Sequence, residues 1–247
     1  MQVFHLWEGN FWATQDKLFI PIPLVTKNEQ IIKPEHAIKI SVQPFLVICN
    51  NDYILCDSGL GNFQNATNAL EENLKKLNIN SLQITKILIS HLHRDHCYGL
   101  LKNTTSGWKL NFPNAKIYIK RAEYDYALNQ MSSSYNKEFI INLKTFEKNI
   151  IWIESDYEWI DNYILVEKSG GHCPFHQVFK IIDQGQIVFY GGDELPQEKF
   201  LIYNLKAFYD YAPEKARDLR KNWKIQSSTE NWQILYYHDI PIETNSN

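Results

Sequence analysis

The segment from Ser90 to Cys97, SHLHRDHC, places three histidines and one aspartate within six consecutive positions. Imidazole and carboxylate groups without thiolates are the ligands of hydrolytic zinc sites, which keep coordination positions open for water. His91 and His93 are two residues apart, so an extended loop can direct both imidazoles at one cation. Asp95 and His96 are adjacent at the expected start of a helix and can face a second, nearby centre. The segment therefore predicts a metal site rather than a solvated polar loop.

Three later segments contain further groups of the same chemical kind. SGGHCPFHQ contains His172, FYGGDELP contains Asp193, and LYYHD contains His238. Glycine pairs precede His172 and Asp193, where they allow close approach of the backbone. Together with the first segment, these segments hold six of the eight histidines of the chain. Two metals bridged by one carboxylate, about 3.5–4 Å apart, would use such a set of groups.

Strands and helices must bring these four segments together. Apolar and β-branched runs predict buried strands, and i, i+3, i+4 spacing predicts helices. Strands are expected at 38–49, 53–61, 84–90, 115–120, 163–169, 177–183, 186–193 and 232–239. Helices are expected at 65–77, 121–131, 136–148 and 213–226. The first two strands flank the polar turn Asn50-Asn51-Asp52, which is typical of a hairpin. The candidate ligands lie mostly just beyond strand ends, so we expect them at one edge of a layered α/β scaffold.

Composition narrows the class of protein. The chain has 247 residues, 44% of them hydrophobic and 21% charged, which is ordinary for a globular protein. It contains no internal repeat or low-complexity linker, so we expect residues 1–247 to form a single domain. The net charge of -3 predicts no nucleic-acid partner. No apolar stretch is long enough to span a bilayer, and no secretory signal is visible, so a cytoplasmic location without a membrane partner is expected. The four cysteines contain no CxxC pair and fit a reducing compartment.

The order HLHRDH, GGHCPFH, GGD and a late HD resembles the metallo-β-lactamase-fold metallo-hydrolase superfamily. LCDSGLG, which begins at Leu55, is similar to the acidic-glycine motif of that family. These elements run from Asp57 to His238 and so cover most of the chain. The resemblance implies an α/β fold, a four-layer αββα sandwich with its site along one edge. Within the superfamily, the chain looks like the single-domain group of lactonases and methyl-parathion-hydrolase-like enzymes.

The resemblance also implies roles for individual residues. The first metal would be bound by His91, His93 and His172. The second metal would be bound by Asp95, His96 and His238, with Asp193 bridging the two. Asp57 and His176 match positions that orient ligands, although Asp57 could instead form a turn beside Gly59 and His176 a structural hydrogen bond. The implied cofactors are two divalent metal ions, zinc first, with manganese or iron as alternatives. Asp95 is the candidate proton shuttle.

The implied activity is hydrolysis of an ester, lactone or related acyl bond of a small molecule by a hydroxide that bridges the metals. Lactonases of this group have a tyrosine three residues after the bridging aspartate, where this chain has Pro196. Phosphoester hydrolysis at the same site, and iron-dependent redox or sulfur chemistry, therefore remain alternatives. The aromatic start of the chain, with Trp7 and Phe19, is interpreted as core packing, a contact of a possible homodimer, or an apolar wall of the substrate pocket.

Overall fold

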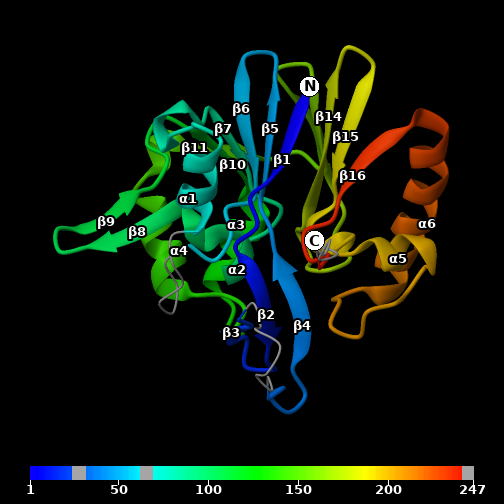
Figure 1. Ribbon diagram of the computed structural model, residues 1–247, viewed down its shortest axis with the longest axis horizontal. Helices are drawn as coiled ribbons and strands as arrows, with labels where there is room; N and C mark the ends of the chain where they lie inside the picture. Colours follow the sequence, from blue (N-terminus) through cyan, green and yellow to red (C-terminus); the bar gives the residue numbers. More distant parts are fainter. Residues whose placement is uncertain (24–31, 62–68, 241–247) are drawn as a thin grey trace, which may run out of the picture.

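Two β-sheets face each other and carry helices on their outer sides, as the computed structural model shows for residues 1–23, 32–61 and 69–240 (Figure 1). This arrangement is the predicted four-layer αββα sandwich. The single-domain interpretation of the whole chain stays a prediction. Among the helices in the described ranges, none has the length and apolar character needed to cross a membrane.

The first sheet has six strands in the order β1-β5-β6-β7-β10-β11. Its strands are β1 (Gln2–His5), β5 (Phe45–Cys49), β6 (Asp52–Cys56), β7 (Lys86–Leu88), β10 (Lys116–Lys120) and β11 (Ile150–Ile153). Asn50 and Asn51 adopt the left-handed conformation, with φ of 49° and 65°, as two-residue hairpin turns require. The predicted hairpin is therefore confirmed as the antiparallel pair β5–β6. Strands β6, β7, β10 and β11 run parallel, so their carboxyl ends meet at one edge.

The second sheet has five strands in the order β12-β13-β14-β15-β16. They are β12 (Tyr157–Ile160), β13 (Ile164–Lys168), β14 (Gln177–Asp183), β15 (Gln186–Tyr190) and β16 (Trp232–Leu235). The last two strands pair in parallel, although about forty residues separate them in sequence. Asp193 and His238 follow these two strands, so the parallel pairing places both residues at the same edge.

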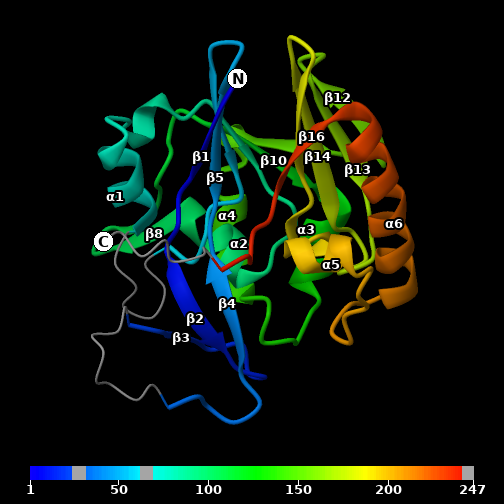
Figure 2. The same cartoon turned by 45° about the vertical axis from the view of Figure 1, so that its right-hand side comes forward.

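Helices cover the outer face of each sheet, as the two views show (Figures 1 and 2). On the first sheet lie α1 (Ala69–Lys76), α3 (Arg121–Leu128) and α4 (Lys137–Lys144). On the second lie α5 (Glu198–Ile202) and α6 (Pro213–Glu230). The expected start of the first helix, residues 65–68, lies outside the described residues. Leu70 and Leu74 of α1 are buried, which confirms the apolar face inferred from their spacing.

The two sheets are held together by an apolar core between their inner faces. Val47, Ile54, Phe179, Ile181 and Val188, from strands of both sheets, are at most 2% exposed. Burying one such side chain contributes about 1.5–3 kcal/mol. This core gives the edge of the sandwich a rigid base on which polar side chains can be held.

The run 38–49, which the sequence suggested as one strand, is two strands in different sheets. β4 (Ile38–Val42) joins a three-stranded sheet in the order β3-β2-β4, and β5 enters the first large sheet. The break falls at Gln43 and Pro44, because proline lacks the N–H group that a continuous ladder needs. The other strands of the small sheet are β2 (Gly9–Ala13) and β3 (Phe19–Pro21). A hairpin of β8 (Leu101–Thr104) and β9 (Gly107–Leu110) was not predicted.

Glu8, between β1 and β2, supports the turn after β6: its Oε2 accepts a hydrogen bond from the Leu60 N–H at 2.7 Å. Burial raises the pKa of Glu8 to about 8, although backbone hydrogen bonds oppose the shift.

An acid whose pKa is higher in the folded state than in the unfolded state lowers the free energy of unfolding above its unfolded pKa. This loss grows until the pH passes the folded pKa. We therefore expect Glu8→Gln to stabilise the protein by about 2 kcal/mol at pH 8 and by less at pH 5, in urea unfolding. The exposed Glu72→Gln is the control, and an equal gain at both pH values would contradict the assignment.

Candidate metal centre

Seven polar side chains from four segments converge at the edge of the sandwich where the parallel strands end. The loop after β7, the short helix α2 (Arg94–Cys97), the β13–β14 loop, the turn after β15 and the end of β16 contribute to the set. The structure places the side chains in two groups: His91, His93, His172 and Asp193, and then Asp95, His96 and His238. Within each group, one potential ligand atom per residue lies within 4.8 Å of the others. These are the seven residues that the sequence analysis assigned to metals.

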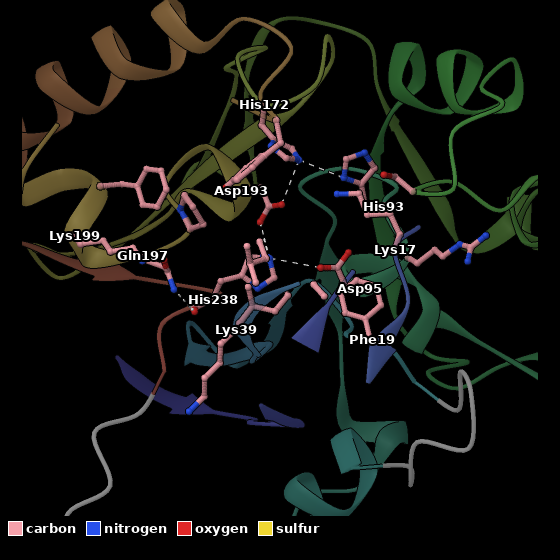
Figure 3. A pocket seen from close by; sticks show the side chains of 18 residues that line it. Lys17, Phe19, Lys39, His93, Asp95, His172, Asp193, Gln197, Lys199 and His238 are labelled. Carbon is pink, nitrogen blue, oxygen red and sulfur yellow. Dashed lines mark hydrogen bonds and ion pairs between the residues drawn. The ribbon is translucent and has the colours of Figure 1, made fainter. Parts of the chain in front are cut away.

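Asp193 lies between the two groups, and its oxygens face different sides (Figure 3). Oδ1 is 2.9 Å from His238 Nε2 and 3.2 Å from His96 Nε2. Oδ2 is 3.2 Å from His172 Nε2 and 4.0 Å from His91 Nε2. One carboxylate thus connects both groups, as a bridging ligand must.

Several buried polar atoms of this cluster lack a hydrogen-bond partner among the described residues. They are Nε2 of His91, Nε2 of His96 and Oδ1 of Asp193. Oδ1 lies 2.9 and 3.2 Å from two imidazole nitrogens, but the geometry there is not that of a hydrogen bond. Leaving a buried polar group unsatisfied costs about 1–3 kcal/mol, so three such atoms at one place are unfavourable without a further partner. Cations between the two groups would satisfy all three. Imidazole and carboxylate donors also suit zinc and similar divalent metals, so the residues present fit the implied cofactor.

The candidate histidine ligands differ in the direction in which their surroundings shift the pKa. Burial lowers the pKa of His91 and of His93, and neighbouring imidazoles add to the effect for both. For His238, burial acts in the same direction, but the negative charges of Asp193 and Asp95 outweigh it and raise the pKa. The carboxylates thus supply the negative charge that a cluster of cations would need.

Asp57 is completely buried and holds both neighbouring ligands in place. Its Oδ1 accepts a hydrogen bond from the Ser90 N–H at 2.7 Å, and its Oδ2 accepts from the Ser90 hydroxyl at 2.6 Å. Oδ2 also lies 2.7 Å from His96 Nδ1 and accepts from the Tyr190 hydroxyl. Because Ser90 donates to Asp57, its oxygen is left to accept from His91 Nδ1, 3.0 Å away. Both histidines are thereby oriented with Nε2 toward the cluster.

His176 lies outside both ligand groups and supports the bridging residue from behind. Its Nδ1 is 2.9 Å from the Ser169 hydroxyl, and its Nε2 accepts a hydrogen bond from the Asp193 N–H at 3.2 Å. Nδ1 therefore anchors the ring at Ser169, and Nε2 holds the backbone that carries Asp193. This geometry favours the structural hydrogen bond that the sequence left open for His176.

Sequence reasoning missed three buried charged residues that support His172. Asp210 Oδ1 lies 3.0 Å from His172 Nδ1, and the Arg220 guanidinium lies 3.7 Å from the other oxygen of Asp210. Arg220 also donates to the Glu194 carbonyl at 2.7 Å. The Glu194 carboxylate accepts from the backbone N–H groups of Gly171 and His172, at 3.0 and 3.1 Å. Glu194 follows Asp193 directly, which is a weak signal, whereas no sequence pattern indicated Asp210 or Arg220.

A cavity of about 220 Å³ opens onto the cluster of candidate ligands. Its wall includes ligands from both groups, among them His93, Asp95 and His238 (Figure 3). The charged side chains of its wall that are not candidate ligands are all cationic: Lys17, Lys39, Arg94 and Lys199. Arg94, the first residue of α2, is one of these four. Apolar walls come from residues of distant segments, namely Phe19, Ile38, Ile40, Pro196 and Phe200.

The same architecture occurs in solved structures of metal-dependent hydrolases. A probable metal-dependent hydrolase from Staphylococcus aureus aligns with a TM-score of 0.74 and 18% identity, over 96% of this chain and 89% of that chain. AidC, a dizinc quorum-quenching lactonase solved with the product N-hexanoyl-L-homoserine, gives 0.68 and 23%, over 82% and 74%. The hydrolase AbOPH of the β-lactamase superfamily gives 0.67 and 25%, over 96% and 86%. A search of curated proteins returns no match.

The two facing sheets, with their cluster of histidines and aspartates at one edge, define a member of the metallo-β-lactamase superfamily of hydrolases. Residues 39–208 match the sequence profile of a family described as anti-Pycsar protein Apyc1. That stretch covers more than half of the chain, and the chain belongs to this family. It includes all the candidate ligands except His238, which lies beyond its end.

Proposed function

We propose that the protein is a hydrolase with a dinuclear metal centre, most simply a dizinc centre. His91, His93 and His172 would hold the first metal, Asp95, His96 and His238 the second, and Asp193 would bridge them. The observation that carries the proposal is the position of Asp193, whose two oxygens face the two groups of imidazoles. Two-metal sites in hydrolases use such a shared carboxylate to keep the ions about 3.5–4 Å apart.

The chemistry divides between the metals and the side chains. When bound, the metals would lower the pKa of water to roughly 7 and supply a nucleophile at neutral pH. Asp95 is the candidate proton shuttle, because its carboxylate lies at the cavity wall and 3.5 Å from His238 Nε2. His238 is itself held by a hydrogen bond from Nδ1 to the Ser41 carbonyl at 2.7 Å. Asp57 and Asp210 would fix the tautomers of His96 and His172 and so keep each ligating nitrogen pointed inward.

The cavity wall favours an anionic substrate among those that the sequence left open. Four cationic side chains lie in the cavity wall, and the charge of Lys17 is close enough to contribute to the low pKa of His93. A neutral lactone gains little from such a wall, whereas a phosphoester is attracted and oriented by it. Pro196 lies in the wall without a hydroxyl group to offer a lactone carbonyl. A phosphoester, preferably a diester of a small molecule, is therefore the favoured substrate, with esters and lactones as the second candidate.

A substrate panel tests this proposal directly. The protein would be loaded with zinc or with manganese and assayed with bis(p-nitrophenyl) phosphate, p-nitrophenyl acetate and N-hexanoyl homoserine lactone. We expect turnover of the phosphodiester, at least about 100-fold above that of His93→Ala under the same conditions. Turnover of the lactone or the acetate alone would favour the acyl alternative. If the protein as purified is coloured, contains iron in place of zinc and hydrolyses none of the substrates, the proposal of a hydrolase is refuted and redox chemistry is favoured.

Lys17→Gln should reveal the charge of the substrate. Removing this partly exposed cation is expected to cost about 1 kcal/mol in binding an anion, or about a fivefold rise in KM for bis(p-nitrophenyl) phosphate. The KM for the neutral p-nitrophenyl acetate should not change. Lys109→Gln, on the exposed β8–β9 hairpin, is the matched control. An equal effect on both substrates would mean that Lys17 acts through structure rather than through charge.

Asp210→Asn should weaken the first metal site. The substitution keeps the size of the side chain but removes the negative charge beside His172 Nδ1. Losing an outer partner of a metal-binding histidine typically costs about 10–100-fold in metal affinity, and we expect a loss within this range. Zinc titration against a chromophoric chelator measures it, with the exposed Asp218→Asn of α6 as control. Unchanged affinity would show that Asp210 is not needed to orient His172.

A further inference from the structure

Glu123, in helix α3, is buried behind the metal cluster with only 1% of its surface exposed. Its Oε1 accepts a hydrogen bond from the Leu92 N–H and another from the Tyr135 hydroxyl, both at 3.1 Å. Its Oε2 accepts from the Cys173 thiol at 3.5 Å. All three partners are donors, which suits an acceptor with two oxygens. Among the described residues, no lysine or arginine is a main cause of the shift in the Glu123 pKa.

Each partner of Glu123 is next to a candidate ligand of the first metal. Leu92 lies between His91 and His93, and Cys173 directly follows His172. The Tyr135 ring packs edge-on against the His93 ring, with centroids 4.7 Å apart. One carboxylate therefore connects two backbone segments that are about eighty residues apart in sequence and that carry the three imidazoles of one site.

Such a connection can hold the ligands of a metal site at a fixed spacing. A metal site functions only when its ligands are held within about 0.5 Å of the required geometry. Asp57 and Asp210 act on the imidazole rings, whereas nothing in those contacts sets the distance between the two segments. The carboxylate of Glu123 does so through the Leu92 N–H and the Cys173 thiol. Burying a carboxylate without a cationic partner costs folding free energy, and we therefore expect Glu123 to have a function at this position.

We propose that Glu123 is a positioning residue that sets the spacing between the His91–His93 segment and His172 and so determines the affinity of the first metal. The inference rests on the proposed two-metal function. It predicts a selective effect, because the hydrogen bonds of Glu123 go to Leu92, Tyr135 and Cys173 and not to the second group of ligands. A merely structural role would weaken both sites together.

Zinc titration of the full-length protein, with a competing chromophoric chelator, resolves the two binding events. Glu123→Gln presents an amide N–H to at least one of the three donors. It should weaken one event by about 10–100-fold, as we also expect of Asp210→Asn, and leave the other unchanged. Glu138→Gln, an exposed glutamate of α4, is the control and should match the wild type. The melting temperature of each metal-free variant reports any general loss of stability.

Cys173 offers a second, milder test that does not depend on a stable Glu123 variant. Cys173→Ser keeps a donor for the Glu123 carboxylate, whereas Cys173→Ala removes it. We expect weaker binding of the first metal in Cys173→Ala than in Cys173→Ser, with the second metal equal in both.

Equal affinities in the two Cys173 variants, or equal weakening of both binding events in Glu123→Gln, would overturn the positioning role. Two zinc ions bound by the wild type without hydrolysis of any substrate would instead refute the proposed reaction, and the comparison of variants would still decide the role of Glu123.

Discussion

Asp193→Ala is expected to abolish hydrolysis and to reduce the zinc bound at both sites. The side chain lies within 3.2 Å of His96, His172 and His238, and it would belong to the coordination of both proposed metals. Outer partners of metal ligands already contribute about 10–100-fold to affinity, so a shared ligand should contribute more. Metal analysis after dialysis and turnover of bis(p-nitrophenyl) phosphate measure the two losses together.

The control for this substitution is Asp125→Ala, which removes an exposed aspartate from helix α3. Asp193→Asn supplies an intermediate case, because the amide keeps one oxygen for one group of imidazoles and presents N–H donors to the other. We expect it to retain more of one metal than of the other. Full metal content in Asp193→Ala would disprove the bridging role, even if activity were lost.

The candidate ligands could be found from sequence because each follows a predictable strand. β7 is a short apolar run, and the histidine cluster begins three residues after its last residue, Leu88. β15 and β16 are equally clear, and Asp193 and His238 follow them at the same edge. Parallel strands bring their carboxyl ends together, so the chemistry of the residues and the position of the strands agree. The resemblance to the metallo-β-lactamase superfamily, which rests on these motifs, is confirmed by the solved structures that share the fold.

The residues that support the candidate ligands could not be found in this way, because their contacts are set by packing between elements distant in sequence. Asp210 lies in a loop, and Arg220 lies on a helix whose outer face is polar, so neither differs from a surface residue in sequence. Only the docking of α6 buries Arg220 and directs it at Asp210. The cationic wall of the cavity is equally non-local, since Lys17, Lys39 and Lys199 come from segments that no motif connects.

Asp57→Ala is expected to have the largest effect on stability of all single substitutions considered. It leaves buried donors without an acceptor: the Ser90 N–H, the Ser90 hydroxyl, the Tyr190 hydroxyl and His96 Nδ1. Each unsatisfied buried donor costs about 1–3 kcal/mol, so a loss of at least about 4 kcal/mol is expected in urea unfolding. A loss of that size is comparable with the whole stability of many proteins, which is about 5–15 kcal/mol.

Backbone conformation contributes to this loss and has to be separated from the hydrogen bonds. Asp57 has φ of 56°, a left-handed conformation that aspartate and asparagine tolerate better than alanine does. Asn78, which is exposed and has φ of 58°, gives the matched control: Asn78→Ala incurs the backbone cost alone. Asp57→Asn keeps the backbone preference and one oxygen, so it should fold and should bind the second metal weakly, because His96 loses its charged partner. If Asp57→Ala costs no more than Asn78→Ala, the hydrogen bonds around Asp57 do not stabilise the site, and the orientation of His96 must come from its packing against Tyr237.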